Sequence, residues 1–520
     1  MRVLSFTVDG WVDPAAAFVA LYREADNSVW LDSGIHAEQG ISVIGVASRA
    51  VTASVTAGTV TTSGAVEPGT IFDFLRRNLA DYDVPAGEGF QLGWIGWLGY
   101  ELRAQTMGQV LAHRSRYPDA ALAFLDRAIV FDHASRVVEL RALGEEWTGE
   151  LLSWRDAAQC GLRNAAACEP STVLSGPSTP VCGSSTAVCE TSAVLCGSSS
   201  ERGTSTRIET SGQVSIRPGA AYSTGTTMPG AAYSTGTTPP PAATWAHKDS
   251  EYLAMIRECQ AAIAAGDAYQ LCLTTQVVVD IRPDPVDSYL RLRESSPTHH
   301  GGFIRIGEVS LLSATPEQFI AVSPNGEVST KPIKGTRRRG NTVDEDRQLR
   351  DELERSDKER AENLMIVDLM RNDISRVSEV GSVRVTSLLA VESYAQVHQL
   401  VSTISGRLAA GVTGMDAVES CFPAGSMTGA PKRSATDILD RLEGQARGIY
   451  SGAFGYFSLD GRIDLAMVIR SIILDPDGAT VGSGGGITAL SVPEEELDEV
   501  YLKAAALLTV LGVQARPSVR

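Results

Sequence analysis

A basic string between Ser329 and Gly340, STKPIKGTRRRG, contains the first candidate for covalent chemistry. It places Lys334 before a glycine, a threonine and three consecutive arginines. A lysine amine attacks carbon only when it is neutral, and neighbouring positive charges lower its pKa toward that state. Many strings of this composition are solvated surface loops. The string therefore predicts either a nucleophilic lysine or a basic turn.

Two predicted helices each begin with a pair of glutamates. Ser356 and Glu359 have capping-box spacing, and Pro493 suits the first turn of the second helix. The pairs are Glu359 with Glu362 and Glu496 with Glu499, three residues apart and so on one helix face. Brought together, they could hold Mg²⁺, a hard cation that prefers oxygen ligands. The alternative is that these acids only stabilise helix N-termini.

Glycine is concentrated in three further strings. They are PAGSMTGAPK (Pro423 to Lys432), GIYSGAFGYF (Gly448 to Phe457) and VGSGGGI (Val481 to Ile487). Consecutive glycines let backbone N–H groups converge on an anion, although turns use glycine as well.

Helices and strands are predicted to alternate without a regular βαβ rhythm, which favours an α+β fold with antiparallel sheets. SEYLAMIRECQAAIAAGDAYQ from Ser250 predicts a helix with Ser250 as N-cap, followed by a strand over 271–281. The run from Ala120 to Leu140 predicts two strands with a polar turn between them. GWIGWLGYE, from Gly93, predicts a strand that a neighbouring backbone approaches closely.

The chain divides into two dense regions, 1–160 and 246–514. Between them, 165–245 is rich in Ser, Thr, Gly and Pro and repeats PGAAYSTGTT at 218–227 and 229–238. A segment of this composition cannot bury a core, so it is predicted to be a disordered spacer without chemistry.

Composition excludes some classes of protein. A net charge of −17 argues against nucleic-acid binding. The N-terminus has no signal-like apolar run and no membrane-length apolar run follows, so a cytoplasmic protein without a membrane partner is expected. The eight cysteines form no C-x-x-C pair and are expected to be free thiols.

Taken in order, these strings resemble those of the chorismate-utilising enzymes. ERAENLMIVDLMRND (Glu359 to Asp373) and PAGSMTGAPK carry most of the resemblance, which covers 245–514. It implies an α+β fold like that of anthranilate synthase component I, with two antiparallel β-sheets packed together and flanked by helices. P-I-K-G-T at 332–336 is similar to the lysine-type aminodeoxychorismate synthases, whereas anthranilate synthases have alanine at the lysine position.

The resemblance implies a reaction and roles for residues. Lys334 would add at C2 of chorismate as the C4 hydroxyl leaves, and ammonia would then add at C4 and expel the lysine. Glu317 would be the general acid for the hydroxyl. The implied Mg²⁺ ligands are Glu359, Glu362, Glu496 and Glu499. The implied substrate-binding residues are Thr336, His398, Tyr450, Arg470, Gly484, Gly485 and Gly486, with a buried structural histidine as the alternative for His398.

The resemblance also implies a source of ammonia. No cysteine of the printed sequence lies in an amidotransferase nucleophile motif, so a separate glutamine amidotransferase subunit is expected, forming a heterodimer. The product, 4-amino-4-deoxychorismate, would be a precursor of p-aminobenzoate. The alternatives are anthranilate synthase component I and a chorismate-binding subunit without catalysis. Water addition, as in isochorismate synthases, is disfavoured because Gln270 stands where those enzymes have a lysine. Ser33 resembles a tryptophan-binding serine, and whether tryptophan binds is left open.

Overall fold

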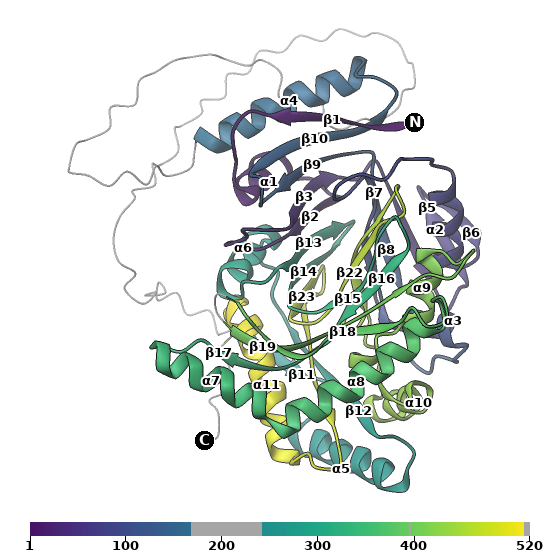
Figure 1. The fold of residues 1–520 in the computed structure, drawn as a ribbon, viewed down its shortest axis with the longest axis vertical. Helices are drawn as coiled ribbons and strands as arrows, with labels where there is room; N and C mark the ends of the chain where they lie inside the picture. The colour runs from purple at the N-terminus through teal and green to yellow at the C-terminus, as the bar shows by residue number, and fades with distance from the viewer. Residues whose placement is uncertain (168–241, 395–396, 514–520) are drawn as a thin grey trace, which may run out of the picture. The chain divides into compact units, whose positions relative to one another are not determined.

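Two antiparallel β-sheets form the framework of the protein in the computed structural model (Figure 1). The structure describes residues 1–167, 242–394 and 397–513, which lie in one compact unit. Most of the predicted spacer, 168–241, lies outside the described residues. Its two ends belong to regular elements, because helix α4 (Gly149–Ala167) extends to Ala167 and Ala243–Trp245 form strand β11.

The first sheet has twelve strands among the described residues. In spatial order they are β1 (Arg2–Val8), β10 (Val137–Gly144), β9 (Arg127–Asp132), β3 (Ile41–Val46), β2 (Ser28–Asp32), β13 (His300–Ile306), β14 (Val309–Thr315), β23 (Ser471–Asp475), β24 (Gly478–Ile487), β12 (Gln270–Val279) and β11, with β20 (Gly429–Ala430) also paired to β12.

The second sheet also has twelve described strands. Their order is β17 (Ile333–Arg338), β19 (Val397–Arg407), β16 (Glu327–Lys331), β15 (Gln318–Val322), β22 (Ile463–Met467), β21 (Ala453–Ser458), β7 (Gly93–Leu98), β8 (Ala120–Leu125), β4 (Arg49–Ser54), β5 (Thr59–Thr62) and β6 (Ala65–Pro68), with β18 (Arg384–Ser393) also on β19.

Both sheets combine strands from the two dense sequence regions. In the first sheet, β2 pairs with β13, so that Asp32 lies opposite Gly301. In the second sheet, β7 pairs with β21 on one side and β8 on the other. A Cβ on Gly96 of β7 would lie 2.0 Å from the carbonyl oxygen of Ala121, so the predicted close backbone approach at GWIGWLGYE is confirmed.

Apolar side chains fill the space between the sheets and also cover the outer face of the first sheet. These side chains form a first cluster between the sheets and a second cluster on the outer face of the first sheet. Because successive side chains of a strand point to opposite faces, Val29 of β2 belongs to the first cluster and Trp30 to the second. The second cluster packs the outer face against α1 (Pro14–Tyr22), α4, α6 (Pro285–Ser295) and α11 (Pro493–Val510). The fold is therefore the predicted α+β arrangement of two packed sheets with flanking helices.

The remaining helices include α8 (Asp357–Ser375), which packs across β16, β17, β18 and β19 of the second sheet. The others are α2 (Ile71–Ala80), α3 (Arg103–Met107), α5 (Asp249–Ala265), α7 (Val343–Arg355), α9 (Gly414–Cys421) and α10 (Lys432–Glu443), with 3₁₀ turns at Tyr100–Leu102 and Gly425–Met427. No helix in the described ranges combines the length and apolarity needed to cross a membrane.

Two local predictions are corrected by the structure. The run from Ala120 to Leu140 forms three strands, because the chain leaves the second sheet after β8 and enters the first sheet with β9. The helix predicted with Ser250 as N-cap has its N-cap two residues earlier, at Lys248, and begins at Asp249. The backbone N–H of Lys248 donates to the Glu251 carboxylate at 2.8 Å, which fixes the start of α5.

Candidate active site

Lys334 lies on β17 next to a register shift. β17 pairs with β19, and the shift falls between Lys334 and Thr336, where Gly335 has a φ of 77°. A Cβ at Gly335 would lie 2.7 Å from Leu353 and 3.0 Å from the Glu359 carboxylate, so glycine is required there on both counts. The shift brings the PIKGT string against the first turn of α8.

Acidic groups surround the Lys334 ammonium. Burial lowers its pKa, but attraction from Glu362, Glu317 and Glu499 outweighs burial, so the pKa of Lys334 lies above its ordinary value. The prediction that neighbouring cations lower this pKa is therefore wrong for the protein without ligands.

The three arginines that follow Lys334 each have an acidic partner. Arg337 lies 3.1 Å from Glu352 and 3.5 Å from Glu359, Arg338 lies 2.5 Å from Glu345, and Arg339 lies 2.7 Å from Asp346. These pairs tie β17 to helices α7 and α8. The arginine charges are therefore compensated locally and do not act mainly on the lysine.

Glu317 lies between β14 and β15 and is 7% exposed. Burial raises the pKa of Glu317, although the Lys334 ammonium and a hydrogen bond with Ser426 oppose the rise. A carboxyl with a raised pKa keeps its proton at higher pH, as a general acid must. The structure thus brings the predicted acid and the predicted nucleophile within electrostatic reach of each other.

The two glutamate pairs begin α8 and α11, as predicted. The Ser356 hydroxyl accepts from the Glu359 N–H at 3.4 Å, and Pro493 occupies the first turn of α11. Burial raises the pKa of Glu362; Lys334 opposes this, while Glu359 and Glu496 add to it. Like charges affect one another in this way only at short range, so the two helices bring their carboxylates together.

Basic side chains lie among these carboxylates. Lys358 is 3.5 Å from Glu496, Lys503 is 2.7 Å from Glu499, and Arg337 is 3.5 Å from Glu359. In this arrangement, no three acidic, histidine or cysteine side chains of the described residues are placed to hold a metal ion. The donor chemistry nevertheless fits Mg²⁺, since the cluster supplies four carboxylates from two helices.

The glycine strand β24 presents alternate backbone groups toward the site. β23 pairs with β24 only as far as Val481, and β12 covers the other side through Ile487. The Gly484 carbonyl accepts from the Lys503 ammonium at 2.8 Å and so points away from β12. Because the N–H and C=O of one strand residue point the same way, the N–H groups of Gly484 and Gly486 also point away from β12. The N–H of Gly485, opposite Leu273, points toward β12 and is less suited to bind an anion.

Arg470 and Tyr450 lie near this strand. The Arg470 residue is exposed, yet burial of its guanidinium among protein atoms lowers its pKa, with Tyr450 and Glu499 opposing that effect. The Arg470 side chain therefore passes between packed protein atoms and still reaches solvent. A Cβ on Gly482 would lie 2.1 Å from the Tyr450 ring, so this glycine makes room for the buried tyrosine.

Thr336 and His398 are placed differently. Thr336 is exposed on β17 beyond the register shift. His398 on β19 is 1% exposed, and its two ring nitrogens lie 2.8 Å from the Ser393 hydroxyl and 3.1 Å from the Asp346 carboxylate. Both nitrogens are thus occupied, which agrees with the alternative of a buried structural histidine.

Several residues of the recognisable strings hold the site together. Asn363 of α8 donates to the Leu400 carbonyl at 3.2 Å. Leu400 lies on β19, directly opposite Lys334 of β17. Lys432, at the end of PAGSMTGAPK, forms a 2.6 Å ion pair with Asp373, at the end of ERAENLMIVDLMRND. The two most specific strings therefore touch each other.

Three residues near the site were not among the predicted ones. Lys358 and Lys503 contact the glutamates, and Glu101 accepts hydrogen bonds from the N–H groups of Arg447 and Gly448 at 2.9 and 3.0 Å. Burial raises the pKa of Glu101 to about 7. The helical spacing of Lys503 from Glu499 was a usable signal, whereas the contact of Glu101 spans 346 residues and had none.

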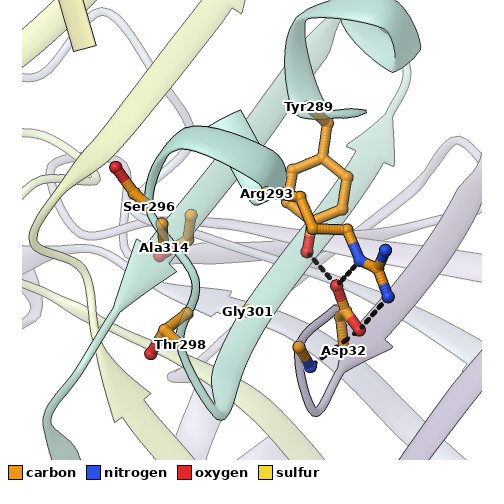
Figure 2. A pocket seen from close by; sticks show the side chains of 9 residues that line it. Asp32, Tyr289, Arg293, Ser296, Thr298, Gly301 and Ala314 are labelled. Carbon is orange, nitrogen blue, oxygen red and sulfur yellow. Dashed lines mark hydrogen bonds and ion pairs between the residues drawn. The ribbon is translucent and has the colours of Figure 1, made fainter. Parts of the chain in front are cut away.

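A small pocket lies between β2 and α6 (Figure 2). Figure 2 shows Arg293 and Tyr289 pointing at Asp32, whose carboxylate lies 2.6 Å from the guanidinium and 3.2 Å from the phenol. Ser33, singled out for tryptophan, donates to the Ile41 carbonyl at 2.7 Å and does not line this pocket.

Comparisons with known proteins identify the family of the chain. A family model described as chorismate binding enzyme matches residues 190–509. Aminodeoxychorismate synthase from Streptomyces griseus is 39% identical over 98% of this chain and 64% of its own length. Anthranilate synthase component 1 from Thermus thermophilus is 43% identical over 49% of this chain and 55% of its own length. The crystal structure of anthranilate synthase component I from Streptococcus pneumoniae covers 91% of this chain, and the match covers 92% of that structure, with a TM-score of 0.67 and 25% identity.

The chain belongs to the family of chorismate binding enzymes. It spans about two thirds of the length of the Streptomyces griseus relative, 64%.

Proposed function

We propose that the protein converts chorismate and ammonia to 4-amino-4-deoxychorismate, a precursor of p-aminobenzoate. The observation that carries the proposal is that Lys334 on β17 and the buried Glu317 lie close enough to act on each other's charge. The reaction needs a nucleophile and a proton donor together, and these two residues supply them. The Streptomyces griseus relative supports the proposal, because its 39% sequence identity runs along nearly the whole chain, while the 43% identity of the Thermus thermophilus anthranilate synthase covers half.

The proposed reaction consists of two displacements. The neutral Lys334 amine forms a bond to C2 of the ring, the two ring double bonds shift, and the C4–O bond breaks. Glu317 gives its proton to the departing hydroxyl, which leaves as water. Ammonia then bonds to C4, the double bonds shift back, and the lysine nitrogen leaves C2 as a neutral amine. The new C4 ammonium gives one proton to the Glu317 carboxylate, which restores the acid. Chorismate and ammonia are consumed, water and the aminated product are formed, and Lys334 is regenerated.

The proposal includes Mg²⁺ held by Glu359, Glu362, Glu496 and Glu499. The bound cation would supply positive charge that holds a substrate carboxylate and offsets the glutamates that raise the pKa of Lys334. The N–H groups of Gly484 and Gly486 and the Arg470 guanidinium are proposed to bind the substrate carboxylates. Tyr450 is proposed to contact the same groups.

Ammonia is proposed to come from a glutamine amidotransferase subunit in a heterodimer. No cysteine of the printed sequence lies in the nucleophile motif of that enzyme, so the proposed reaction needs ammonia that these residues do not make. A cytoplasmic location is part of the proposal, and the described cysteines, Cys160, Cys259, Cys272 and Cys421, are free thiols that suit a reducing compartment.

The test is product identification by mass spectrometry with chorismate, Mg²⁺ and ammonium at mildly alkaline pH. The wild type should form aminodeoxychorismate. Lys334→Ala should lower the rate by orders of magnitude, whereas Lys331→Ala, which removes an exposed lysine at the end of β16, should leave it unchanged. Calorimetry then measures whether Lys334→Ala still binds chorismate. Retained binding shows that the variant has lost chemistry and not its structure.

Anthranilate as the product would contradict the proposal and support the alternative, anthranilate synthase. Two observations favour that alternative: the 43% identity of the Thermus thermophilus enzyme over half of the chain, and the match of the Streptococcus pneumoniae structure over 91% of it. Binding of chorismate without turnover under any condition would instead indicate a non-catalytic subunit.

A further inference from the structure

Lys358 occupies a position for which the proposed reaction has no use. It is the second residue of α8, next to Glu359, and its ammonium lies 3.5 Å from the Glu496 carboxylate of α11. Its side chain remains 56% exposed, while that of Glu496 is 4% exposed. The lysine therefore reaches from solvent to a buried carboxylate on the other helix.

The four glutamates all act on this one ammonium. Attraction from Glu496, at 3.5 Å, and from Glu362, Glu499 and Glu359 reaches it. Lys334, Lys503 and Arg337 also face the cluster. Four carboxylates thus meet four basic side chains, and the cluster is close to neutral without any added ion.

A divalent cation would add two positive charges to this balanced cluster. Of the four basic groups, Lys334 extends from a sheet strand, Lys503 is bound to the Gly484 carbonyl as well as to Glu499, and Arg337 is also paired with Glu352. Among the described residues, Lys358 forms an ion pair with Glu496 alone, at the long end of ion-pair distance, and its flexible stem lies in solvent. It is the group that can leave at the lowest cost.

We propose that Lys358 is an exchangeable counter-ion of the glutamate cluster. Its ammonium compensates the carboxylates when no cation is bound and swings into solvent when a divalent cation takes its place. Lys358 is then a positioning residue that weakens cation affinity and keeps the helices α8 and α11 together in the cation-free protein. The inference rests on the metal part of the proposed function.

The first test measures binding of Mn²⁺ to the chelator-treated full chain by electron paramagnetic resonance, without substrate. Lys358→Met removes the charge and keeps the stem. It should bind Mn²⁺ about tenfold more tightly, the scale expected for removing one competing unit charge at close range. Lys358→Arg should bind like the wild type. Arg360→Met, an equal charge change on an exposed side chain of the same helix, should have little effect.

The second test measures thermal unfolding of the same variants in chelator. Lys358→Met should unfold at a lower temperature than Arg360→Met, because its carboxylates lose their counter-ion, and saturating Mn²⁺ should abolish that difference. Equal Mn²⁺ affinity in the two Met variants, or weaker binding by Lys358→Met, would overturn the inference. If no variant binds Mn²⁺ but product still forms, the metal part of the proposed function fails. The inference then fails with it, because there is no cation for Lys358 to exchange with.

Discussion

Glu317 and Lys334 have opposite requirements at the scale of single residues. The acid must keep a proton and the nucleophile must lose one. The structure raises the pKa of both groups, the carboxyl through burial and the ammonium through surrounding carboxylates. The protein without ligands is therefore prepared for the proton transfer by Glu317, while the lysine depends on added positive charge before it can react.

Glu317→Gln is predicted to lower kcat by about 10²–10⁴, because the amide fills the same buried space but has no acidic proton. The wild-type kcat should decline as pH rises through the raised pKa of Glu317, since the deprotonated form cannot donate. The residual activity of Glu317→Gln should lack that decline. Steady-state kinetics from pH 6 to 9 check both points, with the exposed Glu327→Gln as control. An unchanged kcat would remove Glu317 from the mechanism.

The sequence indicated the types of the reacting residues but not the sign of their pKa shifts. The arginines next to Lys334 are compensated by Glu352, Glu345 and Asp346, and the charges that do act on the lysine come from α8, α11 and the β14–β15 connection. Such long-range neighbours are not visible in a local string. Motif residues such as Ser356 and Pro493 were predictable because caps depend only on adjacent residues.

At the scale of elements, β24 shows why one glycine string serves two purposes. Gly482 gives space to the Tyr450 ring, whereas Gly484 and Gly486 direct backbone N–H groups away from β12. The sequence could predict anion binding by consecutive glycines. It could not tell which amides were free, because that depends on the register with β12.

Gly482→Ala is predicted to destabilise the fold by about 1–3 kcal/mol, because the new Cβ would meet a rigid buried ring at 2.1 Å. Gly485→Ala should cost much less, since its nearest neighbour is the Glu496 carboxylate at 3.1 Å, the end of a side chain that can shift. That shift should weaken Mn²⁺ binding instead. Urea unfolding of both variants and Mn²⁺ titration of Gly485→Ala measure the two effects. Equal destabilisation would show that the tyrosine is not the obstacle.

At the scale of the whole molecule, the N-terminal region supports the site directly. Glu101 accepts hydrogen bonds from the N–H groups of Arg447 and Gly448, two residues that directly precede the segment containing Tyr450. Strands from 1–167 also lie inside both sheets. The sequence separated two dense regions by composition, but composition does not reveal that their strands interleave, because pairing between distant strands leaves no local pattern.

The interleaving predicts that residues 242–520 will not fold alone. Without 1–167, β13 loses β2 and β21 loses β7, and both sheets end in unpaired edges beside an exposed apolar core. This fragment should show no cooperative thermal transition by circular dichroism. Refolding it together with residues 1–167 should restore a single transition and chorismate binding, because the missing strands can pair from a separate chain. A cooperative transition of 242–520 alone would instead show that the C-terminal region forms a core without its N-terminal strands, and that the sheets are less dependent on their central pairings than their topology implies.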